Sequence, residues 1–219
     1  MKTLTATINK VNKRVISILI LWLFSLSSII GISMGHLDWF ITKTPLNLLI
    51  TLAAVIVIYP LQNKREILGF FIFFATGWFV EWLGVNYGIM FGEYAYGENL
   101  GIKIDGVPVL IAVNWAILIL VSGTIAGQLV KSSLGKILIG ATLMVFLDFF
   151  IEVPAPYFDY WSWDAGHVPL KNYITWFVVS TGLLYVYQKL RIKGDFVFSC
   201  HLYIVQLTFF AYFYAYFSL

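Results

Sequence analysis

Seven long apolar stretches dominate the sequence, and they restrict the chain to structures in which helices cross a lipid bilayer. The stretches are residues 15–35, 46–61, 67–85, 107–130, 134–151, 173–190 and 196–218. Each runs for roughly 16 to 24 residues, close to the ~20 that a helix needs to cross a ~30 Å hydrocarbon layer. Because 60% of the 219 residues are hydrophobic and only 11% are charged, a soluble domain is excluded. We expect an all-α, polytopic membrane bundle of about seven transmembrane helices.

The connections between these stretches are mostly short, and none is a linker rich in Pro, Ser or charge. We therefore expect one integral membrane domain over residues 1–219. The first stretch is longer than the apolar part of a signal peptide and lacks a small-x-small cleavage pattern, so we expect it to remain as a helix. The single cysteine, Cys200, excludes an internal disulfide.

Basic residues gather in alternate connections, and this pattern predicts the orientation of the chain. With the N-terminus in the cytoplasm, 11 of the 14 Lys and Arg residues fall in cytoplasmic segments, and only Lys43, Lys103 and Lys171 lie outside. Positively charged loops stay in the cytoplasm, so we expect a cytoplasmic N-terminus and a multi-pass protein of the cell's inner (cytoplasmic) membrane. The net charge of +3 then reflects topology, and we expect no binding to nucleic acid.

Two acidic residues inside apolar stretches, Glu81 and Asp148, indicate a functional site, since a charge at membrane depth is costly and usually serves a function. Each lies about 14 residues from the inner end of its helix, hence at a height of ~21 Å. By the same count Asn114 lies in the same layer. Glu152 follows Asp148 by four residues, so their carboxyl groups share one helical face. An acid kept dry can stay protonated near neutral pH, as a general acid must be; the structural alternative is hydrogen bonding between helices.

Two long outer loops, residues 86–106 and 154–171, are rich in Tyr and Trp interleaved with acids and glycines. An aromatic belt at the membrane interface accounts for part of this composition. Aromatic faces beside carboxylates would also suit a site that generates a carbocation from an apolar substrate, because the ring faces attract cations.

Two sequence blocks resemble the signatures of the CruF-type carotenoid biosynthesis family. The first comprises Glu81-Trp82-Leu83-Gly84-Val85, Phe91-Gly92-x-Tyr94-x-Tyr96, Leu100-Gly101, Val107-Pro108 and Asn114-Trp115. The second comprises Asp148-Phe149-Phe150-Ile151-Glu152, Trp161-x-Trp163, Gly166, Pro169-Leu170, Asn172-Tyr173 and Trp176. The chain departs from the family pattern at Met90, where a proline is expected, and at Glu152-Val153-Pro154, where Asp-Pro is expected.

The resemblance implies a multi-pass carotenoid 1,2-hydratase. Such an enzyme adds water to the terminal C1,C2 double bond of an acyclic end group, for example of γ-carotene or lycopene, without a cofactor. Protonation of C2 leaves a tertiary cation at C1, where water adds. We expect Asp148 to donate the proton, Glu81 to orient the water, Glu152 to tune Asp148, and Asn114 to fix a hydrogen bond; the two main roles could be exchanged.

The expected contacts of the substrate are aromatic: Trp82, Phe91, Tyr94, Tyr96, Trp115, Trp161, Trp163 and Trp176. We expect the substrate to come from the bilayer, since a carotenoid is as apolar as the lipid interior, and other carotenoid-pathway enzymes to be partners. No metal site is expected, because none of His36, His167 and His201 stands three or four residues from another. Two alternatives stay open: a membrane carotenoid or terpenoid cyclase, and a small proton-coupled transporter.

Overall fold

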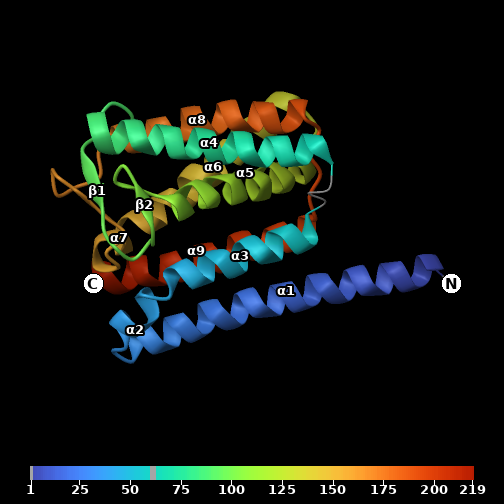
Figure 1. Cartoon of the computed structure of the whole chain (residues 1–219), viewed down its shortest axis with the longest axis horizontal. Coiled ribbons are helices and arrows are strands. Elements are labelled where there is room, and N and C mark those ends of the chain that lie inside the picture. Colours follow the sequence, from blue (N-terminus) through green and yellow to red (C-terminus); the bar gives the residue numbers. More distant parts are fainter. Residues whose placement is uncertain (1, 60–62) are drawn as a thin grey trace.

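Seven long helices run alongside one another in the computed structural model, which describes residues 2–59 and 63–219, with side chains from residue 12 onward (Figure 1). The long helices are α1 (Lys2–Ser33), α3 (Thr44–Ile58), α4 (Lys64–Tyr87), α5 (Val109–Leu129), α6 (Ser133–Glu152), α8 (Leu170–Lys189) and α9 (Phe196–Ser218). The short elements are α2 (Leu37–Ile41), α7 (Pro154–Tyr157), β1 (Tyr94–Tyr96), β2 (Lys103–Ile104), β3 (Val107–Pro108) and β4 (Trp161–Trp163).

These long helices match the seven predicted stretches in order, which confirms the all-α bundle. In the described part of the chain, six segments are long and apolar enough to cross a membrane; α2 and α3 together form one of them, at Leu37–Ile58. The seventh long helix, α8, falls outside these six because Lys, Asn, Gln and hydroxyl side chains dilute its apolar residues. The stretch predicted at 46–61 ends in residues that lie outside those described. The chain is a multi-pass membrane protein.

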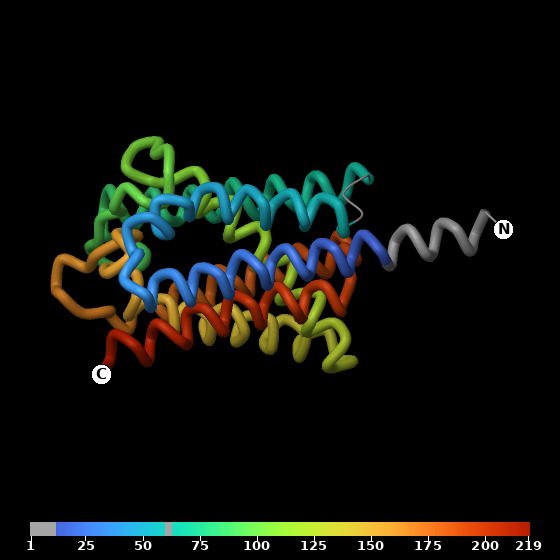
Figure 2. The backbone as a smooth tube through the Cα atoms, turned by 90° about the horizontal axis from the view of Figure 1, so that it is seen from below, coloured from blue at the N-terminus to red at the C-terminus, as the bar shows by residue number. Residues whose placement is uncertain are grey.

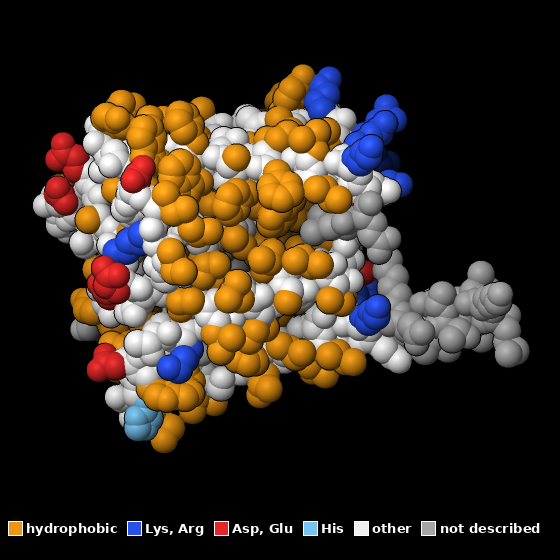
Figure 3. All heavy atoms as spheres, viewed as in Figure 1, with side chains coloured by type: hydrophobic (Ala, Val, Ile, Leu, Met, Phe, Trp, Pro, Cys, Tyr) orange, Lys and Arg blue, Asp and Glu red, His pale blue; other side chains and the backbone are white. Residues whose placement is uncertain are grey.

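The surface of the bundle has the pattern of a membrane protein. Hydrophobic side chains form a broad band across its middle, as Figure 3 shows for one face. Lys and Arg gather at the end where the N-terminus lies, and Asp and Glu gather mainly at the other end, among the strands (Figures 1 and 3). This separation of charge is the one on which the predicted orientation depends; the side of the membrane that each end faces stays a prediction.

Helix α5 is the core of the bundle. Most of it is buried, and Trp115 and Ala116 have no exposed surface. A helix that is apolar on every side is stable only when other helices surround it, and α5 packs against α3, α4, α6, α8 and α9. In Figure 1, α5 and α6 lie between the pair α4 and α8 on one side and α3, α9 and α1 on the other.

Two small antiparallel sheets lie at the end of the bundle opposite the N-terminus (Figure 1). Strands β2 and β3 form a hairpin whose turn is Asp105-Gly106, both with positive φ, as a type I′ hairpin turn requires. Strands β1 and β4 come from the two long outer loops and pair with Tyr94 opposite Trp163 and Tyr96 opposite Trp161. The sequence predicted helices alone and gave no signal that the two loops are joined.

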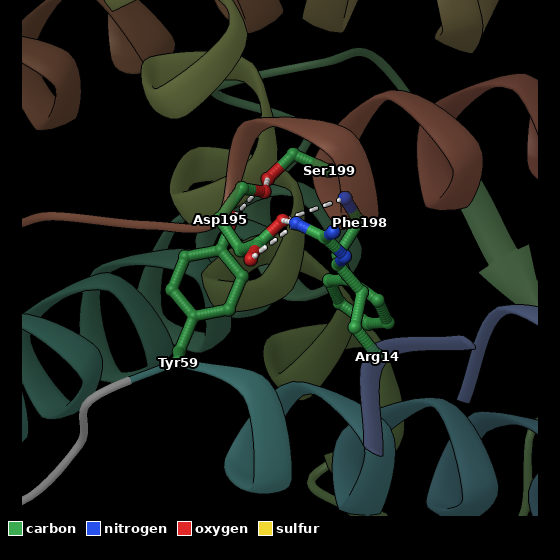
Figure 4. Close-up of polar contacts among 5 residues, drawn as sticks. All are labelled: Arg14, Tyr59, Asp195, Phe198 and Ser199. Atoms are coloured by element: carbon green, nitrogen blue, oxygen red, sulfur yellow. Dashed lines mark hydrogen bonds and ion pairs between the residues drawn. The ribbon is translucent and has the colours of Figure 1, made fainter. Parts of the chain in front are cut away.

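Polar contacts at the other end hold α1, α3 and α9 together (Figure 4). Asp195 caps α9 by accepting a hydrogen bond from the backbone N–H of Phe198 at 3.1 Å, and it forms an ion pair of 3.3 Å with Arg14 of α1. The hydroxyl groups of Tyr59 and Ser199 are 2.7 Å apart, which links the end of α3 to α9. Figure 2 shows α1 running along the bundle between α3 and α9.

Candidate active site

Glu81 lies on the buried face of α4, near the sheets, and its carboxyl group accepts hydrogen bonds from three side chains. Tyr94 and Tyr96 both donate their hydroxyl groups to Oε2, Tyr96 at 2.7 Å, and Trp115 donates its indole N–H to Oε1 at 2.8 Å. Only 3% of Glu81 is exposed. Three donors on one buried carboxyl group offset much of the cost of removing it from water.

The strand geometry of β1 explains why two tyrosines reach the same carboxyl group. Alternate residues of a strand point to the same face, so Tyr94 and Tyr96 face inward and are buried, while Ala95 faces outward and is exposed. Gly84, one turn after Glu81, leaves the space that Tyr94 occupies: a Cβ at Gly84 would lie 2.8 Å from the tyrosine hydroxyl oxygen. Burial raises the pKa of Tyr94 and of Tyr96 well above the usual range, so both hydroxyl groups remain donors.

Asp148 and Glu152 are joined through Asn172, near the start of α8. The side-chain nitrogen of Asn172 donates to Asp148 Oδ2 at 2.8 Å and to Glu152 Oε1 at 2.9 Å. The two carboxyl groups therefore lie on one helical face and share one donor, as their spacing of four residues predicts. All three residues are buried, with no more than 4% of any exposed.

Strand β4 supplies further donors to Glu152, in the way that β1 supplies them to Glu81. The indole N–H groups of Trp161 and Trp163 both donate to Glu152 Oε2, at 3.1 and 2.8 Å. Ser162 between them is exposed, so the alternation along the strand again sets the direction of the two side chains. Since β1 pairs with β4, one small ribbon covers both acidic groups from the same side.

Stacked aromatic rings complete the walls of the site. Trp115 and Trp176 stack with ring centroids 3.9 Å apart and planes 10° from parallel. Phe91 is buried against both of them and against Tyr94. Trp163 lies 5.0 Å from the ring of Tyr94 across the ribbon. Aromatic side chains therefore surround the acids, several of them with their O–H or N–H groups directed at the carboxyl oxygens.

A cavity of about 20 Å³, which we call the acid cavity, lies among these side chains. Its walls include Glu81, Asp148, Glu152, Asn172 and Trp176. This volume is just above the ~10–15 Å³ that one water molecule requires, and the cavity offers several polar partners. In the described part of the chain the ion pairs are Arg14 with Asp195 and Lys103 with Glu98, so the three acids have no basic partner there.

Ten of the twelve predicted site residues therefore meet at this place, and two lie elsewhere. Asn114 faces a larger cavity next to the acid cavity, and among the described contacts it makes no hydrogen bond to any of the three acids. Trp82 follows Glu81 on α4 but lies against Trp78, Phe79 and Tyr87. Neither placement supports the role that the sequence suggested for that residue.

The residue that the sequence analysis missed as a member of the site is Asn172. It supplies the amide that was assigned to Asn114. The sequence signal that could have identified Asn172 as a site residue was its place in the Asn172-Tyr173 pair of the second sequence block. Across the described residues, no group of three or more His, Cys, Asp or Glu side chains is arranged to hold a metal ion.

Comparison with known protein families finds a match. A family model described as carotenoid biosynthesis protein matches residues 43–219, which include every residue of the site described above. Helices α1 and α2 lie outside the matched range. No curated protein and no solved structure matches the chain.

Proposed function

The chain belongs to the carotenoid biosynthesis protein family, and on that premise we propose that it is a carotenoid 1,2-hydratase. Membership gives a role in carotenoid biosynthesis. The observation that carries the finer proposal is the acid cavity: three carboxyl groups and aromatic faces around a space the size of one water molecule. Hydration of an alkene needs a proton donor, a stabilised cation and one bound water.

Asp148 is the proton donor in this proposal. Three ionised carboxyl groups around one small buried cavity, without a basic partner, would be very costly, so at least one of them holds a proton. Glu81 and Glu152 each accept three hydrogen bonds, which favours their ionised form. Asp148 accepts one, from Asn172. It is therefore the acid for which protonation disrupts the fewest contacts.

The reaction then proceeds in two steps. The Asp148 proton is transferred to C2 of the terminal double bond, whose π electrons form the new C–H bond and leave a tertiary cation at C1. The bound water adds to C1 through its oxygen and gives up a proton to a carboxylate, which restores the proton count. Glu81 orients the water, and Glu152 is close enough to Asp148, through their common donor Asn172, to tune it. Phe91 and Trp176, which line the acid cavity, supply aromatic rings for the cation.

A cyclase would use the same protonation, but a neighbouring double bond would capture the cation. We favour hydration because the acid cavity has the volume of a water molecule. The substrate would be an acyclic end group, for example of γ-carotene or lycopene, taken from the cytoplasmic membrane, without a cofactor.

The test is to express the chain in a bacterium that makes lycopene or γ-carotene and to determine the masses of the carotenoids. A product heavier by one water is expected, and it should be absent in Asp148→Asn and in Glu81→Gln at equal amounts of inserted protein. Two exposed acids of the same outer loops, Glu93 and Asp164, provide matched controls as Glu93→Gln and Asp164→Asn. An isomer of unchanged mass would replace hydration by cyclisation, and full activity in both site variants would refute the assignment of the acids.

A further inference from the structure

A second, much larger cavity of about 520 Å³ lies between α1, α3, α5 and α9, and we call it the bilayer cavity. It extends from Leu21 of α1 and Thr51 of α3 to Tyr160 in the outer loop, with Val205 of α9 on another side. From Leu21 to Ile32, both on its wall, α1 rises by about 16 Å. The bilayer cavity therefore occupies much of the half of the bundle that carries the sheets.

Several hydroxyl groups of its wall are bonded to backbone carbonyl groups, while Ser25 Oγ and Gln206 Oε1 on the same wall have no hydrogen-bond partner among the described residues. Ser28 donates to the backbone carbonyl of Phe24 at 2.8 Å, and Thr51 donates to that of Asn47 at 2.9 Å. Thr44 donates to the carbonyl of Ile41 at 2.7 Å. Most other wall residues are Leu, Ile, Val, Phe and Trp. A cavity lined in this way favours an apolar ligand over water.

The bilayer cavity opens beside α1, α2 and the start of α3. Four residues of its wall are exposed: Ser27, Trp39, Lys43 and Leu46. The ammonium group of Lys43 lies 5.6 Å from the ring of Trp39. A Trp and a Lys together are typical of the level where lipid headgroups meet the hydrocarbon layer. The opening thus lies at the edge of the hydrocarbon layer, where a long lipid-soluble molecule can enter laterally from the bilayer.

Two side chains separate the bilayer cavity from the acid cavity. Ile111 of α5 and Trp161 of β4 line both cavities. Trp161 also donates to Glu152, so one face of this wall touches the acids and the other touches the apolar space. An end group in the bilayer cavity would be one side chain away from the carboxyl groups.

We propose that the bilayer cavity binds one end of a linear polyene and that Ile111 and Trp161 form the barrier through which its end group reaches the acids. This inference depends on the proposed function for the identity of the ligand. A dry cavity of about 150 Å³ holds one benzene molecule, so 520 Å³ has room for roughly three such rings in volume. That suffices for one end of a carotenoid, and the rest of the molecule stays in the lipid.

Neighbouring residues of α9 provide the test. Val205 is 6% exposed and lines the bilayer cavity, whereas Ile204 is 47% exposed on the outer surface of the helix and is not part of the cavity wall. Val205→Phe places an added ring in the cavity and Ile204→Phe does not. After expression in a lycopene-making bacterium and purification, Val205→Phe should retain at least about tenfold less pigment per protein than wild type, because an added ring overpacks the ligand's space. Ile204→Phe should retain the wild-type amount.

A milder pair of variants covers the case in which Val205→Phe does not fold. In a Cys200→Ser background, Ser28→Cys places a thiol on the cavity wall and Ser33→Cys places one on the exposed surface of the same helix. Lycopene should protect the thiol of Ser28→Cys from a small thiol reagent and leave that of Ser33→Cys reactive.

The outcomes separate this proposal from the proposed function. Pigment that Asp148→Asn retains and Val205→Phe loses supports the bilayer cavity, even if the wild-type protein were to add no water. Equal pigment in Val205→Phe and Ile204→Phe would overturn the proposal, as would unprotected labelling of Ser28→Cys, even if hydration occurs.

Discussion

Replacing Asn172 by Leu should destabilise the protein far more than the same change at Asn86. Leu has nearly the shape of Asn but no donor, so Asn172→Leu removes two hydrogen bonds to buried carboxyl groups without opening a large cavity. Asn86 is the matched control because its side-chain nitrogen also donates twice, to the carbonyls of Trp82 and Asp105, both at 3.1 Å, but it is exposed.

The magnitude follows from the charge and burial of the acceptors. If Glu152 is ionised and Asp148 protonated, as proposed, the hydrogen bond to Glu152 is worth about 1.5–3 kcal/mol and the one to Asp148 about 0.5–1.5 kcal/mol. Asn172→Leu should therefore cost about 2–4.5 kcal/mol. Asn86→Leu should cost at most about 1 kcal/mol, because water replaces its donor at the exposed carbonyls.

Thermal unfolding of the purified protein in one detergent, followed by tryptophan fluorescence, measures the difference. At about 2–4 °C per kcal/mol for a chain of this length, Asn172→Leu should lower the Tm by roughly 5 to 15 °C, and Asn86→Leu by no more than about 4 °C. Equal shifts for the two variants would refute the reasoning that burial and charge make Asn172 different. Unchanged thermal stability of Asn172→Leu would show that the acids do not depend on it.

Three further results are expected. Gly84→Ala should lower turnover about 10- to 100-fold, because its methyl group displaces the Tyr94 hydroxyl from Glu81 and removes a hydrogen bond to a charged group. The control Gly127→Ala, with no atom within 4 Å of the added carbon, should leave turnover unchanged. Equal loss of turnover in both variants would contradict the role of Gly84. Tyr96→Phe should lower turnover by a similar factor while the pigment is retained, whereas loss of pigment would show that the hydroxyl group acts in binding. Burial raises the pKa of Tyr94 and Tyr96, so their stabilising contribution is complete below the unfolded pKa of about 10 and is lost as the pH rises through the higher folded pKa. A spectroscopic titration should therefore detect fewer tyrosinates in the folded protein than in the unfolded chain at about pH 10. Equal numbers of tyrosinates in the two states would contradict the raised pKa of these tyrosines.

The bundle was predictable from sequence because it depends on counting residues along helices. The direction of a side chain around its helix was not. Asn114 faces the bilayer cavity, and Trp82 points away from the acids because a step of one residue turns a helix by about 100°. Asn172 was missed because the predicted apolar stretch begins at residue 173, whereas α8 begins at Leu170. Strands of three residues are too short for their alternation to stand out in an aromatic loop.

The pairing of β1 with β4 divides the site into two halves of the same plan. In each half a membrane helix carries the acid, a three-residue strand supplies two ring side chains that donate to one carboxyl oxygen, and the following long helix supplies another donor: α4, β1 and α5 for Glu81, and α6, β4 and α8 for Glu152. Every donor therefore follows its acid along the chain, without passing through the other half. During synthesis the first acid can acquire all its partners before the second has left the ribosome. The costly step of placing carboxyl groups in a bilayer is thus taken in two stages, and the ribbon joins two halves whose acids already have their own hydrogen-bond donors.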